Sequence, residues 1–283
     1  MQPTTEQVEA YRRDGFVVVE EFLPADEVER VAEHFATCFQ LQFETGVQPD
    51  EVNYQPGVTP PTKTRQLCNA WKGDRTVAAT TLSARNAEFA SLLEGAPGMR
   101  LFIDNAIWKP ASGTALLAHQ DAAYQECFVP MNMTTCWMAL DETRADTGTI
   151  YYARGSHLWE RLPAGGQFHD PDDWTGYMSE VCPPERFAEV EWVPIEVPAG
   201  GAAFHHGWTW HGSPASERAD RERRSVISHM ITTDTRWHPT ITHPLYSHYR
   251  RPGEVELDEA FFPVMWREDG YRTAVIDDVY AAA

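Results

Sequence analysis

The sequence lacks the features that mark several protein classes. No apolar run approaches the roughly 20 residues of a membrane-spanning helix, and residues 1–6 contain no apolar signal-peptide core. The five cysteines are an odd number, and none forms a Cys-x-x-Cys pair, so we expect reduced thiols rather than disulfides or a zinc site. These absences predict a cytoplasmic protein without membrane contact.

Basic residues are also scarce, with 23 Lys and Arg against 42 Asp and Glu and a formal net charge of -19. A polyanion would be repelled by such a surface, so we expect a small-molecule substrate and no nucleic-acid partner. No cluster of Lys and Arg suggests a site for the phosphates of coenzyme A. Acidity by itself also serves solubility.

Length and composition predict a folded chain. The 283 residues are 42% hydrophobic and 12% aromatic, enough for one substantial core. We therefore expect a single domain, as a monomer or homodimer, with a helical part over about 1–98, a β core over about 99–232 and a tail over 233–283. We found no internal repeat.

The first part has the signals of three helices and one strand. Thr4 and Gln7 have the spacing of an N-terminal capping box, and Asp14-Gly15 ends that helix. A buried strand over 16–19 and a helix from Pro24 follow, whereas 41–70 shows little periodicity. The last helix is predicted over 82–94, and its inward residues are Phe89, Leu92 and Leu93.

Beyond residue 99 the pattern changes to short strands separated by Gly and Pro turns, which favours an antiparallel double-sheet barrel. The expected strands are 100–109, 116–121, 134–140, 148–153, 191–197, 202–206 and 223–232. The long polar segment 154–190 is typical of a functional cover. We expect the tail from Thr233 onward to wrap the barrel.

The motif His119-Gln120-Asp121 and the distant His211 are the candidate metal ligands. Side chains two apart on a strand share a face, so His119 and Asp121 can bind one ion while Gln120 points away. Two imidazoles and a carboxylate form the facial triad of non-haem iron oxygenases. The third ligand requires the His211 strand to lie beside the first. The alternative is a surface His-Asp pair and an unrelated turn histidine.

Several stretches together resemble the phytanoyl-CoA dioxygenase (PhyH) family of Fe(II)- and 2-oxoglutarate-dependent oxygenases. They are the N-terminal segment 5–18, the HQDAAY stretch at 119–124, Gly148 with 154–157, and the segment 198–213. Arg154 stands where the family usually has proline. The resemblance implies a mainly β protein with flanking helices (α+β), whose core is a double-stranded β-helix (jelly-roll, cupin-like) with N-terminal helices packed on one sheet.

The resemblance also implies that His119, Asp121 and His211 are the catalytic centre and hold Fe(II), with 2-oxoglutarate and O2 at the other positions. An arginine fork would bind the distal carboxylate of 2-oxoglutarate. We prefer Arg223, with Ser225 on the same strand face, and keep Arg224 as the alternative. Two further co-substrate contacts are predicted. Trp137 matches a family position that lines the co-substrate pocket, and plain core packing is its alternative role. Gln120 points away from the metal on an ideal strand but could reach the co-substrate where the strand ends.

The implied reaction converts 2-oxoglutarate to succinate and CO2 and hydroxylates an unactivated C–H bond of a small-molecule metabolite, in a specialised-metabolite tailoring step. Desaturation, ring formation and epimerisation use the same iron chemistry. A zinc-type hydrolase and a non-catalytic ligand-binding barrel are the alternatives from other classes. The candidate substrate contacts are Asn69, Trp71, Asn105, Tyr124, Gln125, His206, Trp208 and Trp210, which together would suit a hydroxylated or ring-bearing molecule.

Overall fold

The computed structural model describes residues 1–277. The helices are α1 (Thr5–Asp14), α2 (Ala25–Cys38), α3 (Arg75–Thr81), α4 (Ala84–Glu94), α5 (Gly176–Val181) and α6 (Pro184–Ala188). The strands are β1 (Phe16–Val19), β2 (Glu51–Val52), β3 (Arg65–Cys68), β4 (Gly98–Lys109), β5 (Leu116–His119), β6 (Phe128–Val129), β7 (Met133–Ala139), β8 (Tyr151–Ala153), β9 (Trp192–Pro194), β10 (Ala202–His206), β11 (His211–Ser213), β12 (Arg223–Thr232), β13 (Arg236–Trp237) and β14 (Val264–Arg267).

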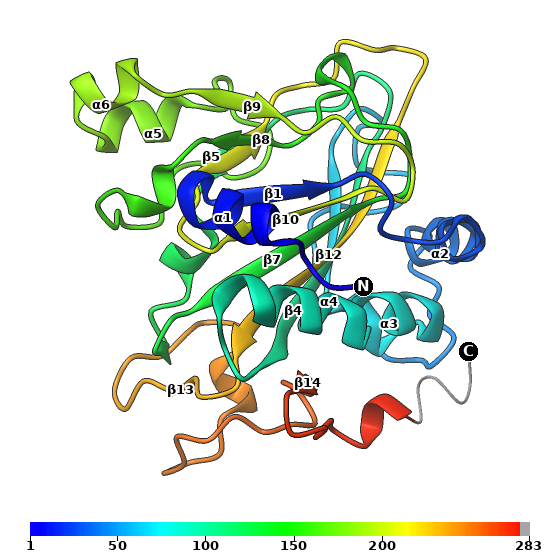
Figure 1. Ribbon diagram of the computed structural model, residues 1–283. Coiled ribbons are helices and arrows are strands. Elements are labelled where there is room, and N and C mark those ends of the chain that lie inside the picture. The colour runs from blue at the N-terminus through cyan, green and yellow to red at the C-terminus, as the bar shows by residue number, and fades with distance from the viewer. Residues whose placement is uncertain (278–283) are drawn as a thin grey trace.

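Two antiparallel sheets form the core of the protein. The larger sheet has the order β1-β10-β7-β12-β4-β3-β2, with β14 also paired to β4, and the smaller one has the order β5-β11-β8-β9. In Figure 1 the smaller sheet lies above the larger one, while β13 and β14 lie below. This is the jelly-roll arrangement of a mainly β protein, so the predicted fold class is confirmed.

Helices cover the outer face of the larger sheet, as α3 and α4 do in Figure 1. Alternate residues of each strand point to this side, so Cys136 and Met138 of β7 join Phe35 of α2 and Phe89 of α4 in one buried cluster. The Phe89 ring stacks on Phe204 of β10 at a centroid distance of 4.5 Å. The expected packing of N-terminal helices on one sheet is therefore present.

The other residues of these strands fill the space between the two sheets. Trp137 and Ala139 of β7 and Ile227 of β12 pack there against Ile150 and Tyr152 from the side of the smaller sheet. Because the side-chain period of a strand is two, the positions that alternate with the outer apolar residues all face this interior. The interior also holds the polar residues of the candidate site.

Many of the predicted elements are present within a residue or two. The α1 capping box and the bounds of β1, β10 and β12 are as predicted. By contrast, β5 ends at His119, and a 3-10 helix begins at Asp121. The α4 helix places Phe89 and Leu93 inward, but the inward orientation of Leu92 is wrong, because its side chain is 38% exposed. Phe89 and Leu93, four residues apart, form the buried stripe of this helix.

Four regions contain structure that periodicity did not indicate. The segment 41–70 contributes β2 and β3, α3 precedes α4, and the cover 154–190 includes α5 and α6. The tail contributes β13 and β14, and β14 pairs with β4. The larger sheet thus takes strands from all three parts that we expected along the chain, including β1 from the first part.

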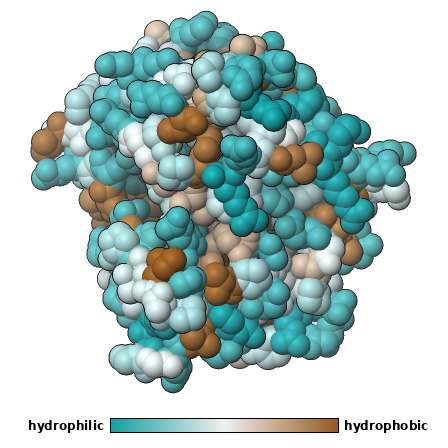
Figure 2. Space-filling view, turned by 90° about the vertical axis from the view of Figure 1, so that its left-hand side faces the viewer, coloured by the Kyte–Doolittle hydropathy of each residue, from teal (hydrophilic) through white to brown (hydrophobic). Residues whose placement is uncertain are grey.

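Among residues 1–277, no helix combines the length and apolar character that crossing a lipid bilayer requires. The face in Figure 2 is mainly hydrophilic, and its hydrophobic residues form small, separated groups. This face therefore offers no extended apolar surface.

Candidate functional site

The structure brings the three predicted metal ligands together. In the register of β5 and β11, His211 lies directly opposite His119, so the expected adjacency of the two strands is present. Gln120 keeps an extended backbone, with φ -117° and ψ 123°. The alternation of the strand therefore continues to Asp121 although the sheet pairing stops at His119. One ligand atom from each of the three residues lies within 4.8 Å of the others.

Backbone carbonyls orient the two histidine rings. His119 Nδ1 lies 2.8 Å from the carbonyl of Leu117, and His211 Nδ1 lies 2.9 Å from that of Thr209. A carbonyl only accepts, so Nδ1 donates in both rings, and the neutral ring presents an unprotonated Nε2. Burial, followed by the charge of His211, lowers the pKa of His119 and favours this neutral form.

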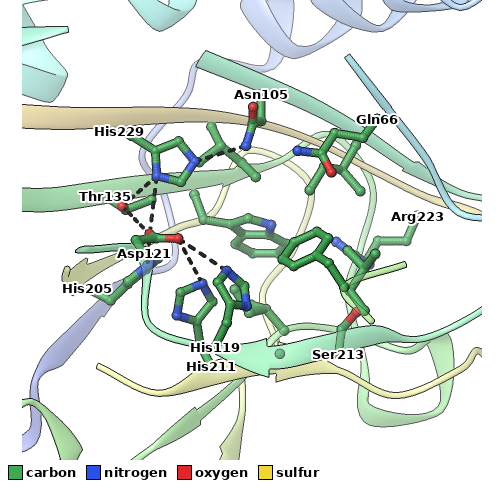
Figure 3. A pocket seen from close by; sticks show the side chains of 17 residues that line it. Gln66, Asn105, His119, Asp121, Thr135, His205, His211, Ser213, Arg223 and His229 are labelled. Atoms are coloured by element: carbon green, nitrogen blue, oxygen red, sulfur yellow. Dashed lines mark hydrogen bonds and ion pairs between the residues drawn. The ribbon is translucent and has the colours of Figure 1, made fainter. Parts of the chain in front are cut away.

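Both Nε2 atoms point to the same carboxylate oxygen (Figure 3). Asp121 Oδ1 lies 3.3 Å from His119 Nε2 and 3.5 Å from His211 Nε2. When both rings are neutral, the two Nε2 atoms and Oδ1 therefore face one another with their lone pairs, and no proton lies between them. A cation relieves this repulsion. Ligand atoms about 2.1 Å from one ion and at right angles would lie about 3.0 Å apart, so the spacing and the donor types fit an iron ion.

The second carboxylate oxygen of Asp121 is held in place by its neighbours. Thr135 Oγ1 donates to Oδ2 at 2.8 Å, and His205 Nε2 lies 3.0 Å and His229 Nδ1 3.2 Å from it. His205 Nδ1 in turn lies 2.8 Å from the hydroxyl of Tyr152. Oδ2 is thereby occupied and Oδ1 is directed to the two histidine ligands, as expected for an oriented metal ligand.

Asp121 is ionised in this environment. Burial acts to raise its pKa, but the interactions with His229, His211, His119 and His205 together hold that pKa well below its usual value. Burial lowers the pKa of His205 to about 3, so this ring is neutral at neutral pH and donates its Nε2 proton to the carboxylate. The site thus offers one negative charge and two imidazoles to a cation.

A small cavity of about 60 Å³ adjoins the three candidate ligands and ends at Arg223. Arg223 is 2% exposed, and its Nε has no hydrogen-bond partner among the described residues. Nη1 lies 3.5 Å from Ser225 Oγ, and Trp137 also lines the cavity, with its ring centroid 5.8 Å from Arg223 Cζ. Burial lowers the pKa of Arg223 to about 10. This side chain is therefore a buried cation without a paired anion at neutral pH.

Arg224 points to the other side of β12. Its Nη2 and Nε lie 2.7 and 3.0 Å from the carboxylate of Asp141, and Arg224 does not line the small cavity. Successive side chains on a strand point to opposite faces, so only one of the two arginines reaches this cavity.

A buried amine, that of Lys109, lies beside the small cavity in contact with Ser213. It lies opposite Arg223 in the register of β4 and β12, and its Nζ donates to Ser213 Oγ at 2.7 Å and to the carbonyl of Pro214. Burial, followed by the charge of Arg223, lowers the pKa of Lys109 well below its usual value. Because Lys109 occupies the acceptor side of the Ser213 hydroxyl, this hydroxyl is free to donate elsewhere, and Ser213 lines the cavity.

A larger cavity of about 310 Å³ opens on the other side of His119 and Asp121. Three of the predicted substrate contacts, Asn105, Tyr124 and Gln125, line it. Phe168 of the cover and Tyr246 of the tail also contribute to its wall. The tail therefore packs beside the barrel, as expected, and the segment 154–190, which we predicted to be a functional cover, contributes to the same wall.

Five predicted contacts point elsewhere, and we withdraw their assignment to the site. Gln120 donates to the carbonyl of Trp208 at 2.7 Å, and Asn69 donates to Asp50 at 2.6 Å. His206 faces Glu94, because the neighbouring His205 takes the inward position on β10. The Trp208 ring lies under Arg161, with Cζ 4.8 Å from the centroid, and Trp210 packs in a cluster away from the metal ligands. Trp71, named with these residues, lines neither cavity.

The sequence signals missed several residues that line the two cavities, namely Gln66, Thr135, Phe168, His205, Ser213 and His229. Some had a readable signal. Ser213 follows His211 by two, and His229 follows Arg223 by six, so the strand period places them inward. Gln66 and Phe168 lie in segments without periodicity, and no local pattern indicated them.

Known proteins share a sequence pattern and a fold with this chain. The sequence profile of the family described as Phytanoyl-CoA dioxygenase (PhyH) matches residues 11–225. No curated protein matches the sequence. Among solved structures, the non-heme alpha ketoglutarate dependent carbocyclase SnoK from nogalamycin biosynthesis is similar, with a TM-score of 0.71 and 22% identity over 93% of this chain and 96% of that one.

Two other solved structures have the same fold. The epimerase SnoN from nogalamycin biosynthesis has a TM-score of 0.69 and 21% identity, over 92% of this chain and 98% of that one. EctD from S. alaskensis, solved with 2-oxoglutarate and 5-hydroxyectoine, has a TM-score of 0.70 and 17% identity, over 90% and 87% of the two chains. At these identities the likeness is one of fold.

Proposed function

The chain belongs to the phytanoyl-CoA dioxygenase family of Fe(II)- and 2-oxoglutarate-dependent oxygenases, and from this premise we propose that it hydroxylates an unactivated C–H bond of a small-molecule metabolite. Succinate and CO2 are the co-products. One observation above all supports the proposal: three proton-free donor atoms meet beside a cavity that ends in a buried arginine without an anion. A metal ion would bind the three donor atoms. A dicarboxylate co-substrate would supply the carboxylate that pairs with Arg223.

In this proposal His119, Asp121 and His211 hold Fe(II). Iron with 2-oxoglutarate and O2 supplies the oxidising power for C–H cleavage. The carbonyls of Leu117 and Thr209 keep each Nε2 free of a proton and aimed at the ion. Contacts on the second oxygen of Asp121 fix the direction of the first.

Arg223 would bind the distal carboxylate of 2-oxoglutarate, and Ser225 and Ser213 would stand beside it. A guanidinium fork suits a carboxylate because it donates two parallel hydrogen bonds. Trp137, Ile107 and Ile227 form apolar walls of the same cavity, which would exclude water from the reacting centre and strengthen the charge interaction. Arg224 is already paired with Asp141 and takes no part.

The larger cavity would receive the metabolite, and we propose a specialised-metabolite tailoring step over oxidation of a fatty acyl-coenzyme A. No Lys or Arg is among the residues of 1–277 that line this cavity, so nothing there complements the phosphates of coenzyme A. Two solved proteins with this fold are an epimerase, SnoN, and a carbocyclase, SnoK. The product therefore has to be identified directly.

The test is succinate formation from 2-oxoglutarate by the purified protein with Fe(II) and O2. We expect slow turnover without a substrate, loss of turnover in His211→Ala, and no replacement of Fe(II) by Zn(II). A folded protein that forms no succinate, or that hydrolyses esters or amides with Zn(II) instead, would contradict the proposal. With a substrate in hand, a product that gains one oxygen atom supports hydroxylation. A loss of two hydrogens indicates desaturation or ring closure, and an unchanged composition indicates epimerisation.

A further inference from the structure

The two cavities beside the candidate ligands differ in charge. The smaller one ends at the cation Arg223, which has no anion among the described residues. Among residues 1–277, the lining of the larger cavity includes no Lys or Arg, and its carboxylates are Asp121, at the proposed metal site, and Glu51 of β2. The electrostatic preference of the two spaces is therefore opposite.

Glu51 lies at the open side of the larger cavity and has no ion-pair partner within residues 1–277. The neighbouring acid Asp50 is paired with Lys72, at 2.8 Å, and accepts from the Tyr249 hydroxyl at 2.6 Å. Burial, followed by the charge of Glu51, raises the pKa of the facing Cys68 thiol, so Cys68 adds no charge. Glu51 is thus a carboxylate of the cavity wall that has the neutral Cys68 thiol beside it and no ion-pair partner within residues 1–277.

Two histidines of the wall that lie away from the proposed metal ligands, His169 and His243, add no positive charge. Burial, followed by the charge of Lys63, lowers the pKa of His169 to about 4, and burial lowers that of His243. Both rings line the larger cavity, and both are neutral at neutral pH. An incoming carboxylate or phosphate would therefore lose its hydration without a Lys or Arg side chain among the described residues of the wall to pair with it.

The wall of the larger cavity also contains side-chain amide oxygens that accept no hydrogen bond from the described residues. The side-chain oxygens of Gln66, Asn105 and Gln125 are buried and accept no hydrogen bond in the described part of the chain, and all three residues line the larger cavity. The Asn105 amide nitrogen is already turned to His229, at 3.1 Å (Figure 3). Unpaired buried acceptors cost free energy, and a ligand with hydroxyl or ammonium donors would pair them.

Resting on the proposed function, we infer that the larger cavity binds a ring-bearing organic molecule that is neutral or cationic, rich in hydrogen-bond donors and free of carboxylate and phosphate groups. Its donors meet Glu51 and the amide oxygens, and its ring packs among Phe102, Phe168 and Tyr246. Anions are directed to Arg223 instead. This separation prevents the dicarboxylate co-substrate from occupying the substrate space.

Three probes that differ only in charge at one end test this inference: tyramine, tyrosol and 4-hydroxyphenylacetate. The protein is loaded anaerobically with Fe(II) and saturating 2-oxoglutarate, and each probe is titrated by calorimetry at millimolar concentrations. We expect tyramine to bind at least about fivefold more tightly than 4-hydroxyphenylacetate, in keeping with one partly solvated charge contact, and tyrosol to lie between them.

Charge substitutions locate the effect. Glu51→Lys should remove or reverse the preference for tyramine over 4-hydroxyphenylacetate, and Glu51→Gln should weaken tyramine while leaving tyrosol unchanged. Glu29→Lys is the matched control, because Glu29 is an exposed acid on α2 that lines neither cavity, and it should leave all three affinities as they are.

The outcomes separate this inference from the proposed function. If the visible band of the Fe(II)–2-oxoglutarate chelate fails to form, the proposed function fails. If the band forms but 4-hydroxyphenylacetate binds as tightly as tyramine, or none of the three probes binds, the inference alone is overturned. A preference for tyramine that Glu29→Lys abolishes as fully as Glu51→Lys would also overturn it, since the effect would then reflect net charge.

Discussion

Arg223→Met is the substitution that most sharply separates co-substrate binding from stability. Methionine is unbranched and of similar length, so it can fill the space of the arginine stem among the apolar walls. In the wild type, Arg223 is 2% exposed and forms no ion pair with a carboxylate among the described residues. Its removal therefore breaks no ion pair of the ligand-free protein but removes the proposed partner of the distal carboxylate.

The magnitude follows from this burial. Loss of one partner from a buried ion pair costs about 3–5 kcal/mol. Every 1.4 kcal/mol is tenfold in a dissociation constant, so 2-oxoglutarate should bind between about one hundredfold and a few thousandfold more weakly. The ligand-free variant should melt no lower than the wild type, because a buried charge without an anion has been replaced by an apolar group.

The assay is an anaerobic titration of the Fe(II)-loaded protein with 2-oxoglutarate, followed by the visible band of the chelate. Arg224→Met is the control, since Arg224 is paired with the partly exposed Asp141. This control should cost about 1 kcal/mol of stability at most and leave 2-oxoglutarate binding unchanged. An affinity of Arg223→Met close to the wild type, or a larger loss in Arg224→Met, would refute the assignment.

Two predictions concern stability. Burial raises the pKa of Asp104, on β4, to about 7, well above the unfolded value of about 3.9. The folded state therefore binds more protons between these values, and stability present at low pH is lost as the pH rises from about 4 to about 7. Asp104→Asn removes this loss, so its melting temperature relative to wild type should increase from pH 4 to pH 8; a constant difference would contradict the assignment. Phe89→Ala should cost about 3–5 kcal/mol of unfolding free energy, because Phe89 is fully buried and stacks on Phe204. Leu92→Ala on the same helix, where Leu92 is 38% exposed, should cost less than about 1 kcal/mol. Equal denaturant midpoints for the two variants would show that the packing of α4 has been misread.

Much of the site could be predicted because it follows the period of a strand. The strand bounds of β12 were predicted, and alternation places Arg223 and Ser225 on one face and Arg224 on the other. The choice between the two arginines stayed open in the sequence, and the structure places Arg223 in the small cavity. His119 and Asp121 share a side for the same reason, although the sheet pairing ends between them. Local periodicity thus sufficed wherever the backbone stayed extended.

The wrong predictions concern positions where a shift of one residue in register, or a segment distant in the sequence, determines which side chain faces the site. His206 was chosen over His205, and a shift of one residue moves a side chain to the opposite face; in the structure His205 contacts Asp121. Trp208 and Trp210 lie beyond the end of β10, where alternation no longer applies. Phe168 and Tyr246 come from the cover and the tail, and no local pattern specifies how such long connections return to the barrel.

The anaerobic chelate of Fe(II) and 2-oxoglutarate is the most direct test of the central claim that His119, Asp121, His211 and Arg223 form one composite site. The account predicts a weak visible charge-transfer band when both components are added to the wild-type protein. It also predicts no band in His119→Ala and a band only at much higher 2-oxoglutarate concentration in Arg223→Met. A folded wild-type protein that gives no band, or a His119→Ala variant that gives the full band, would contradict it.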